Sequence, residues 1–228
     1  MEIFIDSANI NEIKRWFEMG VIDGVTTNPS IMFKDNVYDA EAGAREIAAL
    51  VHPKPMCVEV TTNDLDEMLV QARTFASLAP NIVVKIPNIT QDGIPCYGVI
   101  RQLENNDIRV NATAALSFGQ VILAAKAGAT YVSIFTGRVS DEGGNAAEVI
   151  RNSVEWLERW KYKTKMIIGS IRSVGDVLTA AIAGAHVITI PPQFLDKMAD
   201  HKYSRETVKQ FVNDAQKALE AMARISTH

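Results

Sequence analysis

The sequence lacks the features that mark several large classes of protein. Its 228 residues include two cysteines, Cys57 and Cys96, too few for a disulfide framework, and reduced thiols are the default in a cytosolic protein. No run of about 18 apolar residues occurs, so we expect no membrane-spanning helix. The N-terminus, MEIFIDSANI, lacks the basic and apolar stretches of a secretory signal. We therefore expect a cytoplasmic protein without a membrane partner.

The chain also has no excess of positive charge and few aromatic residues. Lysine and arginine number 23 against 27 acidic residues, the net charge is −4, and aromatics make up 7%. Binding nucleic acid needs a basic surface or a ladder of stacking rings, so we expect no nucleic-acid partner. No glycine-rich nucleotide motif occurs, which argues against a doubly wound sheet. None of the four histidines, His52, His186, His201 and His228, falls at an inward strand end with a carboxylate partner, so no metal site is expected.

What the chain does contain is a regular alternation of two kinds of segment. Short runs rich in valine and isoleucine alternate with longer amphipathic stretches, which predicts parallel strands joined by helices. Eight such units favour one closed (β/α)₈ TIM barrel over residues 1–228, with a C-terminal helix over Ser204–Ile225. The expected strands are Glu2–Asp6, Ile22–Thr26, Met56–Thr61, Asn81–Pro87, Ile108–Ala112, Thr130–Phe135, Lys165–Ser170 and His186–Ile190.

Local signals indicate where several of the helices begin and end. Asn9, Ser117 and Asn145 are each followed three residues later by an acid or an amide, which is typical of a helix N-terminus. Gly128 and Gly184 each separate an alanine-rich segment from an expected strand, as a glycine at a helix C-terminus does.

Polar side chains fall on the inward-facing parity at the ends of at least six of the expected strands. One such residue could be a satisfied core polar group, because only an unpaired buried group costs about 1–3 kcal/mol. A ring of them at the strand ends, where barrel active sites lie, predicts a lined pocket. The candidates for its lining are Asp6, Thr26, Asn28, Glu59, Lys85, Asn111, Thr113, Ser133, Phe135 and Ser170.

Lys85 is the most informative of these residues, because it lies inside the apolar run Ile82–Pro87. Alone, it could reach solvent from a strand end. In a barrel mouth it could be the amine that forms a Schiff base with a carbonyl substrate. Asp6 and Glu59 could then act as general acid and base, or simply pair with the lysine.

Two arginines follow neighbouring expected strands, Arg138 after the sixth and Arg172 after the seventh. Each alone could be a solvated loop residue. Together with Ser170 they form a plausible phosphate clamp, because a guanidinium matches the spacing of phosphate oxygens.

The motifs that carry these residues resemble those of the short transaldolases and fructose-6-phosphate aldolases, in the family's order over almost the whole chain. They are FIDSANI at the start, GVTTNPSI at Gly24–Ile31, VEV around Glu59, VVKIP around Lys85, NAT at Asn111–Thr113, YVSIFTGR at Tyr131–Arg138 and GSIRS at Gly169–Ser173.

The resemblance implies metal-free and cofactor-free aldol chemistry in a (β/α)₈ barrel. By similarity, Lys85 would form the Schiff base, Asp6 would be the acid/base, and Glu59 with Thr113 would activate water. Thr26, Asn28, Asn111, Ser133 and Phe135 would line the sugar site, and Arg138, Ser170 and Arg172 would bind the phosphate.

The resemblance further implies a transaldolase that moves dihydroxyacetone from sedoheptulose 7-phosphate or fructose 6-phosphate to an aldose phosphate. Glu59 and Phe135 stand where family members that release dihydroxyacetone tend to carry Gln and Tyr. Departures such as Ile134 in place of a usual proline leave open a transferase for an unusual sugar, and a fructose-6-phosphate aldolase is the other enzyme alternative. A non-catalytic barrel that binds sugar phosphates is a further alternative. A homo-oligomer, pentamer or decamer, is implied as well.

Overall fold

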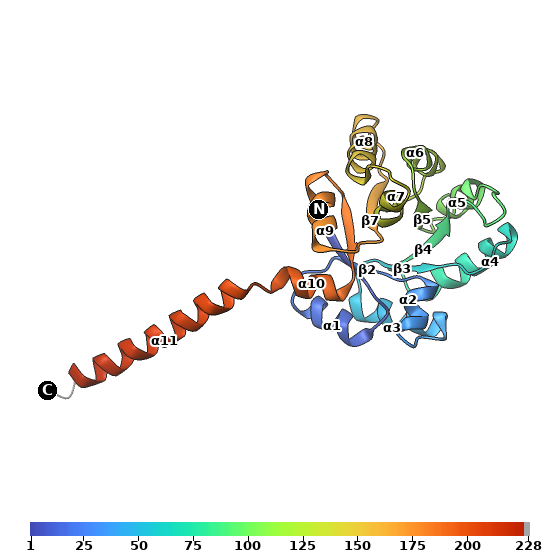
Figure 1. Ribbon diagram of the computed structural model, residues 1–228. Helices are drawn as coiled ribbons and strands as arrows, with labels where there is room; N and C mark the ends of the chain where they lie inside the picture. Colours follow the sequence, from blue (N-terminus) through green and yellow to red (C-terminus); the bar gives the residue numbers. More distant parts are fainter. Residues whose placement is uncertain (226–228) are drawn as a thin grey trace. The chain divides into compact units, whose positions relative to one another are not determined.

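The computed structural model describes residues 1–225 and contains a closed barrel of parallel strands (Figure 1). Each strand pairs with the next one in the chain, and the last pairs with the first. The expected (β/α)₈ TIM barrel is therefore confirmed. The strands are β1 Glu2–Asp6, β2 Gly24–Thr26, β3 Met56–Glu59, β4 Ile82–Pro87, β5 Val110–Ala115, β6 Tyr131–Phe135, β7 Lys165–Gly169 and β8 Val187–Ile190.

Each strand is joined to the next by one helix, or by two in the β2–β3 and β6–β7 connections. Asn9, Ser117 and Asn145 accept backbone N–H bonds at the starts of α1, α6 and α8, as predicted. Gly128 and Gly184 take left-handed φ values of 95° and 93° at the predicted helix ends. Over the described residues the helices are α1 Ile10–Glu18, α2 Pro29–Lys34, α3 Ala40–Val51, α4 Leu65–Ala76, α5 Tyr97–Glu104, α6 Phe118–Ala127, α7 Thr136–Asp141, α8 Ala146–Arg159, α9 Val174–Ile182, α10 Pro192–Ala199 and α11 Lys202–Ile225.

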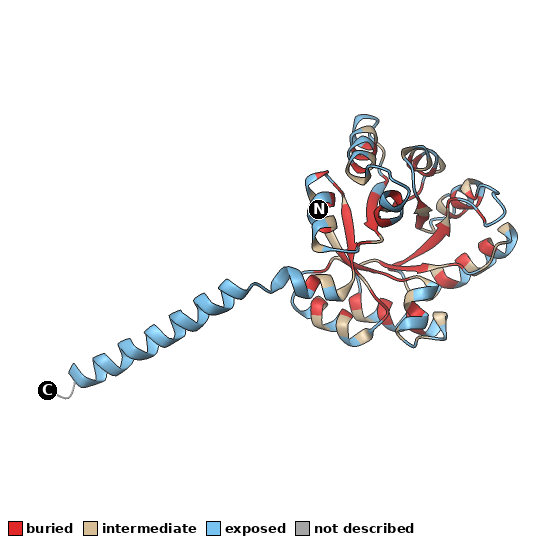
Figure 2. Cartoon of the chain, viewed as in Figure 1, coloured by how far each residue is buried: buried red, intermediate tan, exposed pale blue. Residues whose placement is uncertain are grey.

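The strands are buried on both faces, as Figure 2 shows. Because side chains alternate along a strand, one parity packs under the helices and the other fills the barrel. A layer of buried side chains from six strands closes the interior beneath the barrel mouth: Phe4, Cys57, Val83, Tyr131, Ile167 and Val187. This layer confirms the parity predicted for β1, β3, β4 and β6, and it leaves the polar residues of the same parity above it.

The largest departure from the predicted strand boundaries is in β5, which runs over Val110–Ala115 instead of 108–112. Ile108 is held at the end of α5, where its N–H donates to the carbonyl of Leu103 at 3.1 Å. The pairing of β5 with β6 shifts register between Ala112 and Ala115, and Ala114 has a φ of 57°. The strand therefore continues past Thr113 with a local irregularity that the hydrophobic pattern does not reveal.

The chain forms two compact parts, Met1–Pro192 with the barrel and a helical part that begins at Gln193. One domain over residues 1–228 thus remains only a prediction. Helix α11 confirms the predicted C-terminal helix, and none of its residues is buried (Figure 2). No helix within the described residues is long and apolar enough to cross a membrane.

Candidate active site

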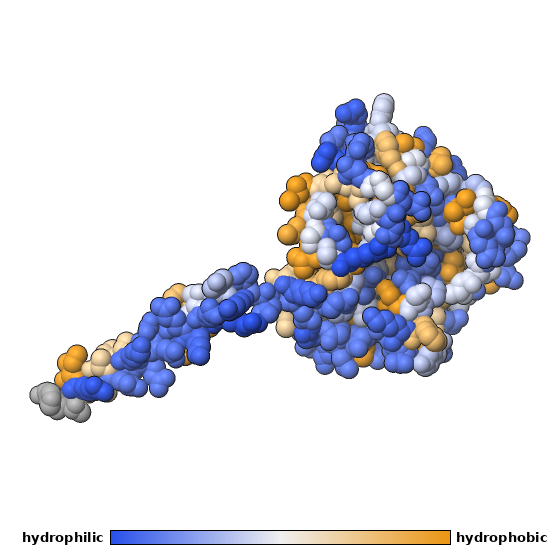
Figure 3. Space-filling model, in the orientation of Figure 1, coloured by the Kyte–Doolittle hydropathy of each residue, from blue (hydrophilic) through white to orange (hydrophobic). Residues whose placement is uncertain are grey.

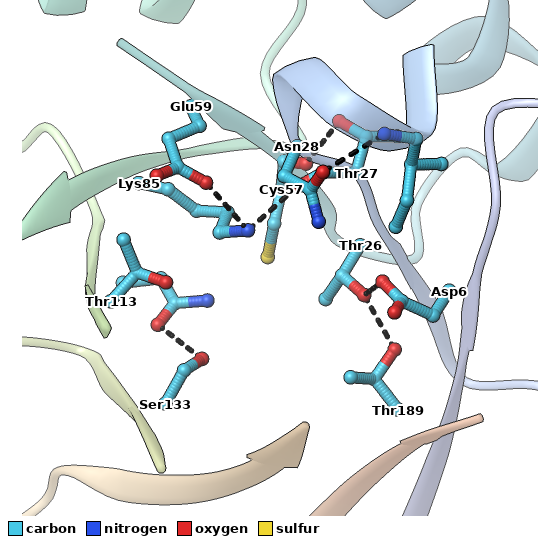
Figure 4. Close-up of polar contacts among 12 residues, drawn as sticks. Asp6, Thr26, Thr27, Asn28, Cys57, Glu59, Lys85, Thr113, Ser133 and Thr189 are labelled. Atoms are coloured by element: carbon cyan, nitrogen blue, oxygen red, sulfur yellow. Dashed lines mark hydrogen bonds and ion pairs between the residues drawn. The ribbon is translucent and has the colours of Figure 1, made fainter. Parts of the chain in front are cut away.

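The carboxyl ends of the strands surround a cavity of about 140 Å³. Parallel strands in a barrel all end at the same face, so residues far apart in the sequence meet there. Figure 4 shows how most of these side chains lie around the opening. The cavity is lined by Asp6, Thr26, Asn28, Lys85, Ser133, Phe135, Arg138, Gly169, Ser170 and Thr189.

Lys85 lies near the end of β4 with its side chain almost fully buried. Its Nζ lies 2.9 Å from Oε2 of Glu59 and donates to the backbone carbonyl of Thr27 at 2.7 Å (Figure 4). Glu59 and Lys85 are directly paired residues of β3 and β4, so the register of the sheet itself brings them together. Lys85 therefore points into the barrel and not to solvent, and its charge is balanced by Glu59.

Asp6 ends β1 on the side of the cavity that faces β2. The hydroxyl of Thr26 donates to its Oδ1 at 2.6 Å, because Asp6 and Thr26 are paired residues of the two strands. Burial raises the pKa of Asp6 above the ordinary aspartate value, while the bond from Thr26 and the charge of Lys85 act in the opposite direction. Asp6 is thus a carboxyl group whose protonation is set by the site, as acid/base chemistry requires.

Strand β5 contributes two buried polar residues to the opposite side of the site. Asn111 and Thr113 are both fully buried. Ser133 on β6 donates to Oδ1 of Asn111 at 2.8 Å (Figure 4). Neither Nδ2 of Asn111 nor Oγ1 of Thr113 has a hydrogen-bond partner within the described part of the chain. Buried polar atoms without partners are costly, and at a site they indicate groups that bind a ligand or water.

Asn28 follows β2 and serves two purposes at once. Its Oδ1 accepts the N–H of Ile31 at 2.9 Å and so caps α2. The same side chain lines the cavity, which leaves its amide nitrogen as the group available to a substrate. The start of α2 therefore fixes the orientation of this asparagine.

The phosphate-binding group predicted from the sequence is only partly assembled. Arg138 and Ser170 both line the cavity, and the guanidinium of Arg138 lies 5.6 Å from the centre of the Phe135 ring. Arg172 does not line it. This exposed arginine forms a two-pronged pair with Asp141 and lines a separate hollow of about 640 Å³ beside α7, α8 and α9.

The backbone around Ser170 is unusual, and this bears on the role of the loop. Ser170 has a φ of 60°, a left-handed value that a serine adopts rarely. Gly137 at the start of α7 approaches it closely, because a Cβ on Gly137 would lie 2.5 Å from the Ser170 carbonyl oxygen. Strained backbone that is held by tight packing clusters at functional sites.

Sequence reasoning missed two groups of the site. Thr189 lies one residue before the end of β8 on the inward parity, and its hydroxyl lies 2.5 Å from that of Thr26. The run HVITI is mostly apolar, and its single threonine on the inward parity is the signal that could have indicated this residue. The carbonyl of Thr27, which accepts from Lys85, leaves no signal in the sequence because every residue has one.

Cys57 lies directly below the site, and its burial raises the pKa of the thiol to about 11. Cys57 is therefore a neutral packing group and not a nucleophile. No group of three or more His, Cys, Asp or Glu side chains that could hold a metal ion occurs in the described residues.

Comparison with known proteins supplies a family for this arrangement. A family model described as transaldolase/fructose-6-phosphate aldolase matches residues 3–228. A probable transaldolase of Petrotoga mobilis is 41% identical over 217 residues, which cover 95% of this chain and 96% of that protein. A probable transaldolase of Syntrophobacter fumaroxidans is 37% identical over 219 residues, which cover 95% and 97%.

Two solved structures are similar in fold only. A mandelate oxidase variant has a TM-score of 0.58 at 16% identity, and the match covers 84% of this chain and 64% of that one. A lactate oxidase of Pediococcus acidilactici has a TM-score of 0.57 at 13% identity, with coverage of 83% and 62%. At these identities the likeness reports the barrel and nothing about the chemistry.

Proposed function

The chain belongs to the transaldolase/fructose-6-phosphate aldolase family, and on that premise we propose that it is a transaldolase. It would transfer dihydroxyacetone from sedoheptulose 7-phosphate or fructose 6-phosphate to an aldose phosphate. The observation that carries this proposal is Lys85, a buried amine in a barrel mouth with the carboxylate of Glu59 at 2.9 Å. Asp6 lines the same cavity.

The proposed reaction begins with the amine of Lys85, which attacks the C2 carbonyl of the ketose phosphate. Glu59 accepts the ammonium proton that must leave first, and loss of water then gives the protonated imine. Glu59 and the unpartnered hydroxyl of Thr113 hold that water. The imine serves as an electron sink for the carbon bond that breaks next.

Asp6 then takes the proton of the C4 hydroxyl as the C3–C4 bond breaks. The electron pair of that bond moves into the imine and forms a three-carbon enamine on Lys85, while the aldose phosphate leaves. An acceptor aldehyde reverses these steps, and Asp6 returns its proton to the new hydroxyl. Because Asp6 works in both directions, a carboxyl pKa above the ordinary value suits it.

The remaining residues would hold the substrate at its two ends. Asn28, Asn111 and Ser133 offer amide and hydroxyl groups to the dihydroxyacetone fragment. Arg138 and Ser170 would bind the phosphate. Arg172 would join them only by releasing Asp141, its partner in the free protein.

Two features favour transfer over release of free dihydroxyacetone. Phe135 lines the cavity with a ring that carries no hydroxyl, so it cannot help a water protonate the enamine. Glu59 stands where family members that release dihydroxyacetone tend to carry Gln. A fructose-6-phosphate aldolase, or a transferase for an unusual sugar, remains the second candidate because substrate choice depends on contacts with the sugar. In a barrel that only binds sugar phosphates, Lys85, Asp6 and Glu59 would have no catalytic role.

Borohydride trapping with fructose 6-phosphate, read by peptide mass spectrometry, tests the proposal. We expect a reduced dihydroxyacetone adduct on the Lys85 peptide and none in Lys85→Met. Lys165→Met is the matched control, since Lys165 pairs with Glu2 at the opposite end of the barrel. In a separate reaction without borohydride, adding erythrose 4-phosphate together with fructose 6-phosphate should yield sedoheptulose 7-phosphate. An unmodified Lys85 with every ketose phosphate tried would reject the Schiff-base mechanism, and free dihydroxyacetone without an acceptor would indicate the aldolase.

We also propose that the protein is a homo-oligomer whose contacts involve α11, with a pentamer or decamer implied by resemblance. Apolar side chains recur along this helix at the spacing of one helical face, at Val208, Phe211, Met222 and Ile225. Figure 3 shows apolar side chains among the hydrophilic ones, most clearly towards the C-terminal end of the helix. A long exposed helix with such a face normally packs against a partner. The cytoplasmic location stays a prediction.

A further inference from the structure

Three side chains from neighbouring strands form a short chain of hydrogen bonds on one side of the cavity (Figure 4). Oγ1 of Thr189 on β8 lies 2.5 Å from Oγ1 of Thr26 on β2, and Thr26 lies 2.6 Å from Oδ1 of Asp6 on β1. The strands β8 and β2 flank β1, so each neighbour of β1 contributes one threonine to the series of hydrogen bonds that ends at Asp6. Thr26 and Thr189 are only 2% and 5% exposed, and water therefore has little access to their hydroxyls.

The number of hydroxyl protons in this series of hydrogen bonds determines which oxygen donates in each bond. A threonine hydroxyl carries one proton and can accept on its lone pairs. When Asp6 is ionised it has no proton to give, so Thr26 donates to it and must accept from Thr189. In the reverse order, the Thr189 proton would have no acceptor among the described residues. The bonds therefore run from Thr189 to Thr26 to Asp6.

We propose that Thr189 is a positioning residue for Asp6: it commits the only proton of Thr26 to the carboxylate and so favours the ionised form. The inference rests on the proposed function, in which ionised Asp6 accepts the proton of the substrate's C4 hydroxyl. Nothing in the family resemblance gave Thr189 a role. Its hydroxyl is engaged with Thr26 and does not depend on substrate, although the residue lines the cavity.

The groups around Asp6 explain why its ionised form needs stabilisation. Burial raises the pKa of Asp6, and the charges of Glu59 and Asp35 raise it further. The hydrogen bond from Thr26 and the charge of Lys85 lower it. The other ionisable groups near it are Arg138, which lines the same cavity, and Cys57 in the layer below. The bond from Thr26 favours the carboxylate more than the charge of Lys85 does. Thr189 strengthens this bond, because linked hydrogen bonds polarise one another.

The variant Thr189→Val removes the hydroxyl and keeps the shape of the side chain. We expect the acidic limb of the kcat/KM profile to move up by roughly half a pH unit, and the rate on that limb to fall about threefold. At a pH well above the limb the rate should approach that of the wild type. Thr189→Ser, which keeps the hydroxyl, should restore the profile. Borohydride trapping with free dihydroxyacetone should be unchanged, because forming its imine requires no C3–C4 cleavage and does not use Asp6.

A double-mutant cycle separates this role from simple packing. In a Thr26→Ala background the change Thr189→Val should have no further effect, because the link to Asp6 is already cut. Equal losses in Thr189→Ser and Thr189→Val, or full additivity with Thr26→Ala, would overturn the proposal. If Thr189→Val does not fold, Thr189→Cys offers a weak donor of similar size and should show an intermediate shift.

A measurement that does not depend on enzyme activity distinguishes failure of the positioning role of Thr189 from failure of the proposed transaldolase function. The side-chain carboxyl of Asp6 is titrated by NMR in carbon-13 aspartate-labelled protein, with its signal assigned from Asp6→Asn. A pKa that rises in Thr189→Val supports the positioning role, even in a protein that transfers no dihydroxyacetone, in which case only the proposed function fails. An active wild type in which the Asp6 pKa does not change on Thr189→Val would reject the positioning role alone.

Discussion

Lys85 and Glu59 are opposite one another on adjacent strands, and their charged atoms lie 2.9 Å apart in the mouth of the barrel. The Lys85 side chain is 5% exposed and that of Glu59 20%, so neither is fully solvated. Removing one partner of such a pair leaves an uncompensated charge, which is more harmful than removing both.

Glu59→Gln should therefore lower the free energy of unfolding by roughly 2–4 kcal/mol at neutral pH. In the double variant Glu59→Gln/Lys85→Met most of this loss should be recovered, because no buried charge remains. Urea unfolding of the wild type, both single variants and the double variant measures the four values. If the double variant loses as much as the two single variants together, the pair does not behave as a coupled unit.

Phe135→Tyr should increase the release of free dihydroxyacetone from fructose 6-phosphate in the absence of an acceptor. The added hydroxyl places a proton donor in the cavity wall, where it can help water protonate the enamine, and the increase should be on the order of tenfold or more. A coupled assay for dihydroxyacetone gives the rate. Phe33→Tyr, at an exposed position, is the control. Equal rates in both variants would remove Phe135 as a determinant of transfer.

Gly137→Ala should weaken the phosphate end of the site. The new Cβ would lie 2.5 Å from the Ser170 carbonyl and 2.7 Å from Nε of Arg172, so the loop must move. We expect KM for a phosphorylated acceptor to rise about tenfold, with less change for an unphosphorylated aldehyde. Gly98→Ala is the matched control, because that exposed helical glycine has no neighbour within 4 Å of the new atom. A KM equal to that of Gly98→Ala would argue against the loop as the phosphate site.

His186 should make the stability depend on pH. Its Nδ1 accepts the N–H of Met166 at 3.0 Å, and burial lowers its pKa below the ordinary value of 6.5. Below that pH the unfolded chain binds the proton more readily than the folded protein. The stabilisation is therefore fully present above 6.5 and is lost as the pH falls, by at most about 1.4 kcal/mol per pH unit.

The variant His186→Gln keeps an acceptor that does not titrate, so its stability should fall less between pH 7 and 5. Urea titrations of the wild type and of His186→Gln at each pH measure the difference between their free energies of unfolding. Asp6, whose raised pKa stabilises the folded protein as the pH falls, contributes equally to both proteins and cancels from this difference. Parallel curves over this range would show that His186 does not carry the effect.

Phe211→Glu should reduce the size of the assembly. It places a charge in the apolar face of α11, whereas Gln210→Glu adds the same charge next to that face. Sedimentation velocity should show smaller species for Phe211→Glu and wild-type species for Gln210→Glu. An unchanged sedimentation coefficient for Phe211→Glu would contradict a role of this face in assembly.

The architecture could be predicted because its signals are local and repeated. Each of the eight strands overlaps its predicted range, and the caps at Asn9, Ser117 and Asn145 lie where the sequence indicates them. The inward parity of Asp6, Glu59 and Lys85 follows from the two-residue period of a strand. The end of β5 could not be predicted, because its register shift depends on pairing with β6.

The sequence could indicate candidate site residues one by one but not the contacts that each of them makes. The sequence indicates Arg138 and Arg172 as a clamp, yet Arg172 is held by Asp141, a competition that depends on where two loops meet. Thr26 lines the cavity, and its substrate-binding role stays a prediction; only the structure shows that its hydroxyl lies between Asp6 and Thr189.

By itself, then, the sequence determined the barrel, the order of its strands and the residue types that face its mouth, since these follow from periodicity and from the fixed chirality of parallel strand connections. Only the tertiary structure decided which side chains form hydrogen bonds and ion pairs with one another. Closing the barrel places β8 against β1 and so brings Thr189 to Thr26, 163 residues apart in the chain. A hydrogen bond depends on distances of a few tenths of an ångström, and these are set by how the strands pack together and not by their spacing in the sequence.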